Sequence, residues 1–218
     1  MLIKIKMKSQ TQKNKSSLID DLNLYNSSCT KCTSCINDKK IYGRGNLNAS
    51  ICVVGEGPGG EEYDNGSPFV GPAGQLLMRI LSAIDIKEED VYFTNVVICR
   101  TSDRNRTPSQ DEVTNCSIRL FNELSIVKPK MTILAGATAL KAVFGSRKRI
   151  GDCHGKWFTS LSEPSYFYFP IYHPSWILHA STPGEIKARK FTMWKDIQVF
   201  RDDLEVMNMI NFNKDTNT

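Results

Sequence analysis

The sequence lacks a long hydrophobic run, a strong excess of either charge and an N-terminal secretion signal. Because no apolar run reaches the length of a membrane span, we expect an intracellular, cytoplasmic protein that has no membrane partner. The net charge of +5 is compatible with a polyanionic partner but is too small to indicate one by itself. The hydrophobic fraction of 40% and the charged fraction of 23% are ordinary for a globular enzyme.

Internal repeats and the usual phosphate-binding motifs are also missing. The segment GEGPGG at 55–60 is not followed by Gly-Lys-Ser, and it fits the GxGxxG dinucleotide motif only loosely. No linker interrupts residues 25–204, so we predict a single domain there and a monomeric protein. The lysine-rich segment 1–24 is predicted to be a flexible basic tail, able to contact phosphate, and 205–218 a flexible C-terminal tail.

Short apolar segments alternate with helical patterns along this domain. Segments rich in β-branched or aromatic residues predict central strands at 51–55, 91–97, 131–135 and 166–171. Apolar residues at helical spacing, or a capping box formed by Ser109 and Glu112, predict helices at 73–86, 109–127, 136–145 and 186–204. The alternation predicts an α/β fold with a mostly parallel sheet that is covered on both faces.

Polar loops follow three of the predicted strands, at the edge where open parallel sheets bind ligands. The first loop, GEGPGGEEYDNGSPFVG at 55–71, combines glycines, carboxylates and one phenylalanine, Phe69. Its glycines either form a plain turn or let the backbone approach a ligand. Phe69 is held between Pro68 and Val70, where it either packs onto the core or stacks on a base.

The other two loops carry one polar side chain each. Asn95 ends the second predicted strand, and its amide offers a donor beside an acceptor, which complements the edge of uracil. A turn asparagine that bonds its own backbone is the alternative. His173 is one of only three histidines, and the neighbouring Tyr172 and Pro174 stiffen its position at the last strand end. A lone histidine on a loop is otherwise more often a surface residue than a catalyst.

Seven cysteines are many for an intracellular chain, and their odd number argues against a disulfide framework. Cys29 and Cys32 form a CxxC pair before the first strand, and Cys99 and Cys116 flank a polar loop. Two separated pairs favour an iron–sulfur or other metal site, with zinc as the alternative on spacing alone. Cys35 is an alternative ligand that could replace Cys29 or Cys32. The two remaining thiols, Cys52 and Cys153, are interpreted as non-ligands.

Taken in order, four stretches resemble the uracil-DNA glycosylase superfamily, and most closely its iron–sulfur family 4. They are GEGPGGEEYDNGSPFVGPAGQLL, VYFTNVVICRTSDRNRTPSQDEVTNC, LAGATAL and YHPSWIL. The resemblance covers roughly residues 29 to 200. It implies a three-layer α/β/α sandwich around a mostly parallel four-stranded sheet. It also implies hydrolysis of the N-glycosidic bond of uracil in single- or double-stranded DNA after base flipping, which leaves an abasic site for DNA repair.

The resemblance further implies roles for single residues. The four cysteines Cys29, Cys32, Cys99 and Cys116 are expected to hold a 4Fe–4S cluster with a structural role. The expected catalytic residues are His173, Glu56 and Glu62, and the expected substrate-binding residues are Gly57, Phe69 and Asn95. The expected DNA-binding residues are Arg100, Arg106, Ser175 and Trp176, together with Arg104 and the basic run at 146–149 as candidates.

Two other functions remain open on the sequence alone. One is a glycosylase-fold protein that binds DNA without cutting it, as an accessory to replication or DNA modification. The other is an iron–sulfur electron carrier. Neither role needs a base pocket, so the joint presence of Glu56, Phe69, Asn95 and His173 favours the glycosylase.

Overall fold

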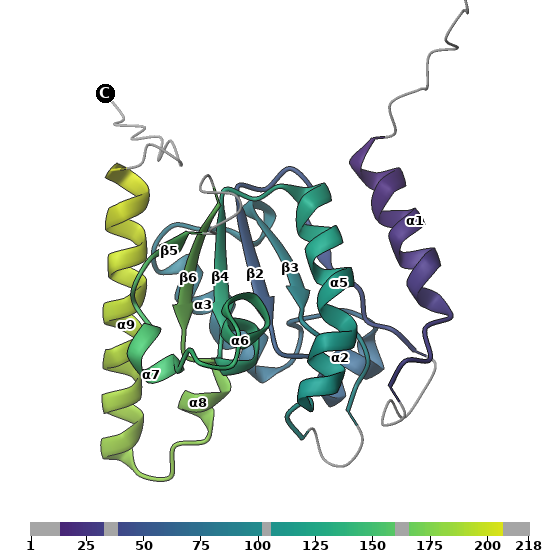
Figure 1. Cartoon of the computed structure of the whole chain (residues 1–218). Coiled ribbons are helices and arrows are strands. Elements are labelled where there is room, and N and C mark those ends of the chain that lie inside the picture. The colour runs from purple at the N-terminus through teal and green to yellow at the C-terminus, as the bar shows by residue number, and fades with distance from the viewer. Residues whose placement is uncertain (1–13, 33–38, 102–105, 160–165, 207–218) are drawn as a thin grey trace, which may run out of the picture.

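A six-stranded sheet forms the centre of the computed structural model, which describes residues 14–32, 39–101, 106–159 and 166–206 (Figure 1). Its order is β1-β3-β2-β4-β6-β5. The four central strands are parallel and lie at the predicted places: β2 (Ile51–Gly55), β3 (Val91–Asn95), β4 (Met131–Ala135) and β6 (Phe167–Ile171). The predicted count of four is two short, because two-residue antiparallel strands close the edges: β1 (Arg44–Gly45) and β5 (Phe158–Thr159).

The central strands are buried on both faces, as their continuous apolar sequences predict. In the parallel register, Val53 lies opposite Phe93 on one side and Ile133 on the other. The strand β3 ends two residues earlier than predicted. Val96 and Val97 leave the ladder and donate to the carbonyl groups of Gly55 and Glu56, although both remain buried.

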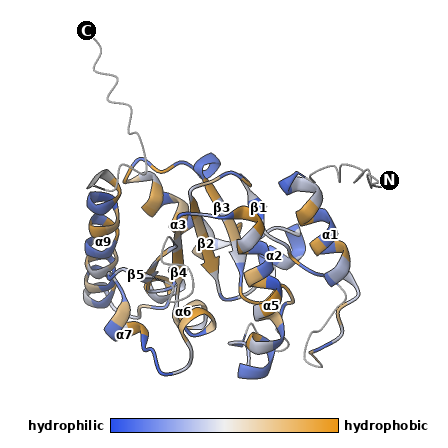
Figure 2. Cartoon of the chain, turned by 45° about the horizontal axis from the view of Figure 1, so that its top comes forward, coloured by the Kyte–Doolittle hydropathy of each residue, from blue (hydrophilic) through white to orange (hydrophobic). Residues whose placement is uncertain are grey.

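Helices cover both faces of the sheet, so the predicted three-layer α/β/α sandwich is confirmed. One face packs against α1 (Lys15–Ser27), α5 (Gln110–Val127) and α6 (Ala137–Phe144). The other face packs against α3 (Pro72–Ser82), α8 (Ser175–Leu178) and α9 (Pro183–Val206). The remaining short elements are α2 (Gly60–Asn65), η1 (Glu88–Asp90) and α7 (Ile150–Cys153). Figure 2 shows the apolar strands enclosed by helices of mixed hydropathy.

Local sequence explains where the helices around the site begin. At the start of α5, the Ser109 hydroxyl accepts from the Glu112 N–H, and the Glu112 carboxylate accepts from the Ser109 N–H, which confirms the predicted capping box. Pro72 opens α3, where its missing N–H costs no hydrogen bond. The helix α3 ends at Ser82, before the predicted 86, because Asp85 adopts a φ of 60°.

The predicted N-terminal tail is corrected in part, because residues 15–24 belong to the helix α1. The Asn14 side chain caps this helix, and Ile19 packs into the core beside α5. Lys15 Nζ donates to the carbonyl oxygens of Leu47 (3.0 Å) and Val127 (2.7 Å), which ties α1 to the domain. At the other end, α9 extends to Val206, two residues past the predicted boundary. The rest of both predicted tails lies outside the described residues.

None of the helices in the described ranges combines the length and the apolar composition that crossing a bilayer requires.

Candidate active site

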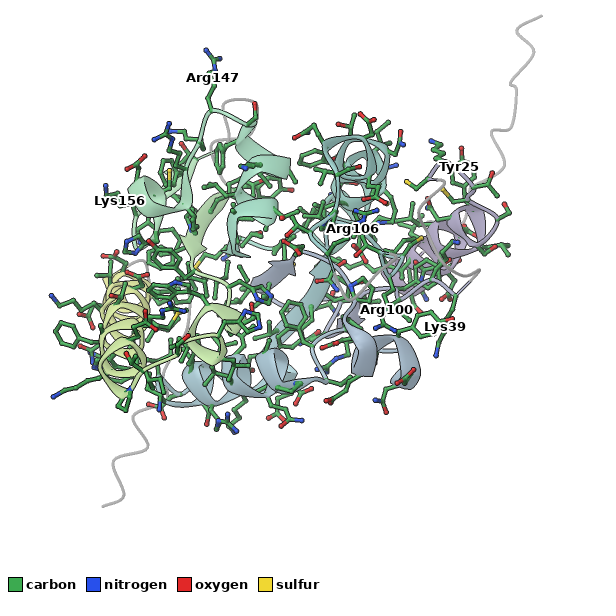
Figure 3. All side chains as sticks on the ribbon, turned by 90° about the horizontal axis from the view of Figure 1, so that it is seen from below. Tyr25, Lys39, Arg100, Arg106, Arg147 and Lys156 are labelled. Carbon is green, nitrogen blue, oxygen red and sulfur yellow. The ribbon has the colours of Figure 1, made fainter. Side chains whose placement is uncertain are left out.

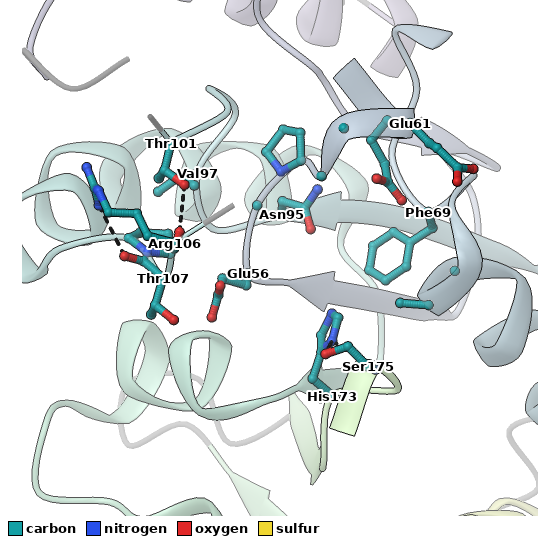
Figure 4. Close-up of a pocket in the computed structure, with 18 of the residues that line it drawn as sticks. Glu56, Glu61, Phe69, Asn95, Val97, Thr101, Arg106, Thr107, His173 and Ser175 are labelled. Carbon is teal, nitrogen blue, oxygen red and sulfur yellow. Dashed lines mark hydrogen bonds between the residues drawn. The ribbon is translucent and has the colours of Figure 1, made fainter. Parts of the chain in front are cut away.

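A cavity of about 710 Å³ opens at the carboxyl ends of β2, β3 and β6, where the sequence predicts three polar loops. Figure 4 shows Glu56, Phe69, Asn95 and His173 around one common space. Eight of the ten predicted catalytic, substrate-binding and DNA-binding residues line this cavity: Glu56, Gly57, Glu62, Phe69, Asn95, Arg106, His173 and Ser175. Arg100 and Trp176 are not among its lining residues.

Phe69 is held in a rare backbone conformation. Its φ is 59°, a value that L residues with large side chains seldom adopt, and its side chain is buried against Phe93 with ring centroids 5.6 Å apart. The first turn of α3 packs directly on the Phe69 backbone. A Cβ on Gly74 would lie 2.2 Å from the Phe69 carbonyl oxygen, so this packing requires glycine. Such strain persists only where surrounding contacts fix it, which is common at binding sites.

Asn95 lies at the last position of β3, directly opposite Gly55 in the parallel register, and is 5% exposed. A Cβ on Gly55 would come within 2.4 Å of Asn95 Oδ1 and 2.7 Å of Phe69 Cζ. The glycine at the end of β2 therefore makes the room in which the amide and the aromatic ring meet. At least one glycine of the segment GEGPGG is thus explained by the packing of Asn95 and Phe69, and a phosphate-binding role is not needed to explain it.

His173 follows β6 and presents its ring to the cavity from the opposite side (Figure 4). Its Nδ1 lies 2.7 Å from Ser175 Oγ and accepts the Ser175 backbone N–H at 3.3 Å. A backbone N–H can only donate, so Nδ1 carries no proton in the neutral ring. The proton of the neutral imidazole is therefore on Nε2, and the ring is a hydrogen-bond donor through that atom.

The environment of His173 keeps the ring neutral. Burial and, to a smaller extent, the nearby His179 together lower the pKa of His173 from its ordinary value of 6.5 to about 4. At neutral pH the site thus holds an uncharged donor.

The two predicted catalytic carboxylates have different surroundings. Glu56 Oε2 accepts from the hydroxyl of Thr138 at 2.5 Å, so the first turn of α6 fixes this carboxylate at the cavity. Glu62 also lines the cavity, but its Oε1 accepts from the Gly71 N–H at 2.9 Å. That bond links α2 to the end of the loop that carries Phe69. Glu62 therefore has a clear part in shaping this loop.

The predicted DNA contacts are partly engaged within the protein. Arg106 makes a two-pronged ion pair with Glu112 at 2.8 and 2.9 Å, and this hydrogen bonding lowers the pKa of Glu112. Arg100 lies over the ring of Tyr63 at 5.9 Å. Figure 3 views the protein from the carboxyl ends of the central strands. It shows Arg100 and Arg106 near the middle of this face and Arg147 projecting from its edge.

Trp176 is packed rather than available. Its ring stacks on Tyr172 with centroids 4.0 Å apart, and the Arg189 guanidinium also lies over the ring, with Cζ 5.1 Å from the centroid. Arg189 Nη1 also donates to the Trp176 carbonyl. The apolar side chain of this segment that does reach the cavity is Leu178, which is 46% exposed.

A second, smaller cavity of about 200 Å³ is lined by all four predicted metal ligands: Cys29, Cys32, Cys99 and Cys116. Its lining comes from α1, the segment after β3 and α5. Burial raises the pKa of the Cys32 and Cys116 thiols, so a bound cationic group would be needed to hold them as thiolates. Within the described ranges, no group of three or more Cys, His, Asp or Glu side chains is arranged to hold a single metal ion.

Four thiols enclose one small cavity, a donor set that suits an iron–sulfur group and, on residue type alone, a zinc ion. Cys52 and Cys153 are buried and do not line this cavity.

Sequence reasoning missed several residues of these sites. Thr138 lies within the stretch LAGATAL, where the resemblance gave a signal but no role. Arg119 lines the cysteine cavity, although its spacing on α5 looks like that of an ordinary surface charge. The predicted candidates Cys35 and Arg104 lie outside the described residues.

Comparison with known proteins agrees with this geometry. Residues 42–198 match the family described as the Uracil DNA glycosylase superfamily. A type-4 uracil-DNA glycosylase of Thermotoga maritima is 40% identical over 69% of this chain and 78% of its own length. The type-4 enzyme of Pyrobaculum aerophilum is 38% identical over 63% of this chain and 72% of its own length. That of Saccharolobus solfataricus is 34% identical over 82% of this chain and 87% of its own length. The chain therefore belongs to the uracil DNA glycosylase superfamily and, within it, to the type-4 family of these relatives.

Proposed function

We propose that this protein hydrolyses the N-glycosidic bond of deoxyuridine in DNA after the nucleotide has been flipped out of the stack. The observation that carries the proposal is the meeting of Phe69, Asn95 and a neutral His173 in one cavity at three strand ends. A pocket with one aromatic face, one amide and one uncharged donor suits a flat, neutral base with adjacent donor and acceptor groups. The type-4 relatives are named for this activity.

Binding of the base would use Phe69 and Asn95. The Phe69 ring, fixed by its backbone and by Phe93, offers a stacking surface that needs no rearrangement. The Asn95 amide donates to O4 of uracil and accepts from N3–H. Cytosine presents the opposite pattern at both positions, so the amide discriminates against it.

Bond cleavage would use His173. As the glycosidic bond breaks, uracil leaves as an anion and negative charge develops on O2. The Nε2–H of His173, set by the hydrogen bonds of Nδ1 to Ser175, donates to this oxygen. A preorganised donor of this kind typically lowers a barrier by about 3 to 4 kcal/mol.

The sugar gains oxocarbenium character in the same step, and Glu56 lies at the same cavity. Its carboxylate, held by Thr138, would stabilise this positive charge and orient the attacking water. We assign Glu62 the supporting role of holding the Phe69 loop through Gly71.

DNA binding would depend on basic side chains at the strand-end face and on an apolar wedge. Leu178 is exposed at the cavity, where it can fill the gap left by the flipped base. Trp176, which was predicted for DNA contact, supports this segment through its stack on Tyr172.

We further propose that Cys29, Cys32, Cys99 and Cys116 hold a 4Fe–4S cluster. When bound, such a group supplies a structural cross-link between these thiolates rather than a reacting atom. It would join the chain after α1 to the segment after β3 and to α5, and Cys99 also borders the active-site cavity. The cysteine site would thereby fix the entrance side of the pocket.

The cysteine assignment predicts the behaviour of two matched variants. Cys99→Ser should lose most of its iron and unfold at a lower temperature, because one ligand of a cross-link is gone. Cys153→Ser replaces an equally buried thiol outside the cysteine cavity and should keep its iron. Iron, sulfide and zinc are measured on anaerobically purified protein. Stoichiometric zinc without iron in the wild-type protein would contradict the assignment.

The proposed activity is tested with labelled oligonucleotides that contain one uracil, as duplex and as single strand. After incubation, alkali should break the strand at the uracil position only, and matched oligonucleotides with thymine should stay intact. A His173→Ala preparation, purified in parallel, controls for contaminating glycosylases. Iron-containing wild-type protein that binds the uracil oligonucleotide but leaves no abasic site would refute the activity and favour DNA binding without cleavage.

A further inference from the structure

A buried polar network lies between the active site and the cysteine cavity, on the face of the sheet covered by α5. Its centre is the ion pair of Arg119 and Glu123, one turn apart on α5, with Nη1 and Oε2 separated by 2.7 Å. The two side chains are only 4% and 1% exposed. The mechanism above makes no use of either residue.

Glu123 is held rigidly from the sheet. Its Oε1 accepts from the Tyr92 hydroxyl at 2.8 Å, and its Oε2 accepts from the Thr94 hydroxyl at 2.6 Å. Both donors belong to β3, the strand that ends in Asn95. The carboxylate therefore fixes the guanidinium of Arg119 against the carboxyl end of this strand.

Arg119 uses its other nitrogens in two further directions. Nη2 donates to the backbone carbonyl of Asn95 at 2.5 Å and lies 3.4 Å from that of Val96. Nε is the one buried side-chain nitrogen or oxygen in the described part of the chain that has no hydrogen-bond partner. A buried donor without an acceptor is costly and calls for an explanation.

The cysteine cavity offers an explanation for the unpaired Nε of Arg119. Arg119 lines this cavity and stands three residues after Cys116 on the same helix. Its positive charge acts on the Cys116 thiol, where it favours the thiolate. Sulfur atoms of an iron–sulfur group, and the thiolates that hold it, accept hydrogen bonds.

We propose that Arg119 is a positioning residue that links the cysteine site to the base-reading strand end. Nε–H donates to the sulfur-rich group held by the four cysteines, and Nη2–H fixes the backbone carbonyl of Asn95. The inference rests on the proposed function of both sites. A purely structural ion pair would need only the bond to Glu123, whereas Arg119 also donates to the Asn95 carbonyl and lines the cysteine cavity.

The test compares Glu123→Gln with the double variant Arg119→Met/Glu123→Gln. Both variants remove the buried carboxylate and keep one amide oxygen, which can accept from Tyr92 or from Thr94. They differ only at position 119, and the double variant leaves no unpaired buried charge, which favours folding. Three quantities are measured: the rate of iron release to a chelator, and kcat and KM for uracil release.

We expect iron release from the double variant to be several-fold faster than from Glu123→Gln. Its kcat should be about tenfold lower, with KM changed much less, because a misplaced Asn95 weakens the transition state more than DNA binding. Arg119→Lys, which keeps the charge but not the three-way fork, should resemble the double variant. If the double variant matches Glu123→Gln in iron release and kcat, Arg119 has only a structural role.

Failure of this inference is distinguishable from failure of the proposed function. Iron release is measured without DNA, so it reports on the Nε contact even if uracil is not the substrate. A wild-type protein that contains no iron overturns both the cluster and the proposed Nε contact. Wild-type activity with normal iron, together with unchanged variants, overturns the role of Arg119 alone.

Discussion

Replacing His173 by alanine should lower the single-turnover rate of uracil release by about a hundredfold or more, as for the loss of one oxyanion donor. The affinity for uracil-containing DNA should change little, because the donor acts mainly on charge that develops as the bond breaks. Rates at saturating enzyme and binding by fluorescence anisotropy separate the two effects.

Ser175→Ala is the matched control for this prediction. It removes the hydroxyl next to Nδ1 but keeps the backbone N–H that defines the tautomer. Loss of one neutral hydrogen bond corresponds to roughly tenfold or less in rate. If His173→Ala abolishes binding and leaves the rate per bound complex unchanged, His173 contacts DNA and does not stabilise the leaving uracil.

The pH dependence adds an independent test of the neutral ring. The folded protein should bind a proton at His173 only near pH 4, whereas the unfolded chain does so near 6.5. The neutral histidine therefore contributes its full stability above pH 6.5, and this contribution is lost as the pH falls toward 4. Nitrogen NMR of labelled histidine, assigned with the alanine variant, measures this titration directly. A midpoint near 6.5 would contradict a partly buried His173 that stays neutral at neutral pH.

The second large effect is expected for Asn95→Asp, which keeps the size of the side chain but not its donor. The carboxylate cannot donate to O4 of uracil, and each mismatched buried hydrogen bond costs about 1 to 3 kcal/mol. Uracil release should fall by roughly ten- to a hundredfold, and slow cytosine release should appear. The cytosine release should be favoured at low pH, where an added proton can bridge cytosine N3 and the carboxylate. Thymine should stay excluded, because its 5-methyl group is excluded by the shape of the pocket and not by the side chain at position 95.

Asn48→Asp controls for the added charge. Asn48 is exposed just before β2, at the opposite end of the sheet from the cavity, so its replacement adds the same charge without touching the base. Oligonucleotides with uracil, cytosine or thymine at one position report all three rates. Uracil release at the wild-type rate by Asn95→Asp would show that Asn95 does not read the base.

The central strands could be predicted from sequence because each is a short apolar run that is buried on both faces. The start of α5 was equally predictable, since Ser109 and Glu112 form a local capping box. The helix α1 was not, because its residues are mostly polar and only Ile19 is buried. Long-range contacts decide its structure, above all the two bonds from Lys15 to the carbonyl groups of Leu47 and of Val127 at the end of α5.

The site was predictable where a residue type is unusual for its place, as for Phe69 on a glycine-rich loop or Asn95 ending an apolar strand. Trp176 shows the limit of such reasoning. An aromatic residue beside His173 suggests a DNA contact, but whether its ring is free depends on Tyr172 and Arg189, and Arg189 lies on α9. Likewise, the burial of Arg119 and Glu123 follows from the packing of α5 on β3, which helical spacing alone does not reveal.

The order of the strands in the sheet has a consequence for synthesis on the ribosome. Phe69 and Asn95 come from the first half of the chain, but His173 follows β6, which pairs with β4 near the far edge of the sheet. Parallel pairing between distant segments forms late, since it must overcome the entropy of closing long loops. A nascent chain can thus present the face that stacks and reads a base well before it holds the donor that releases it. Catalytic competence arrives with the last strand.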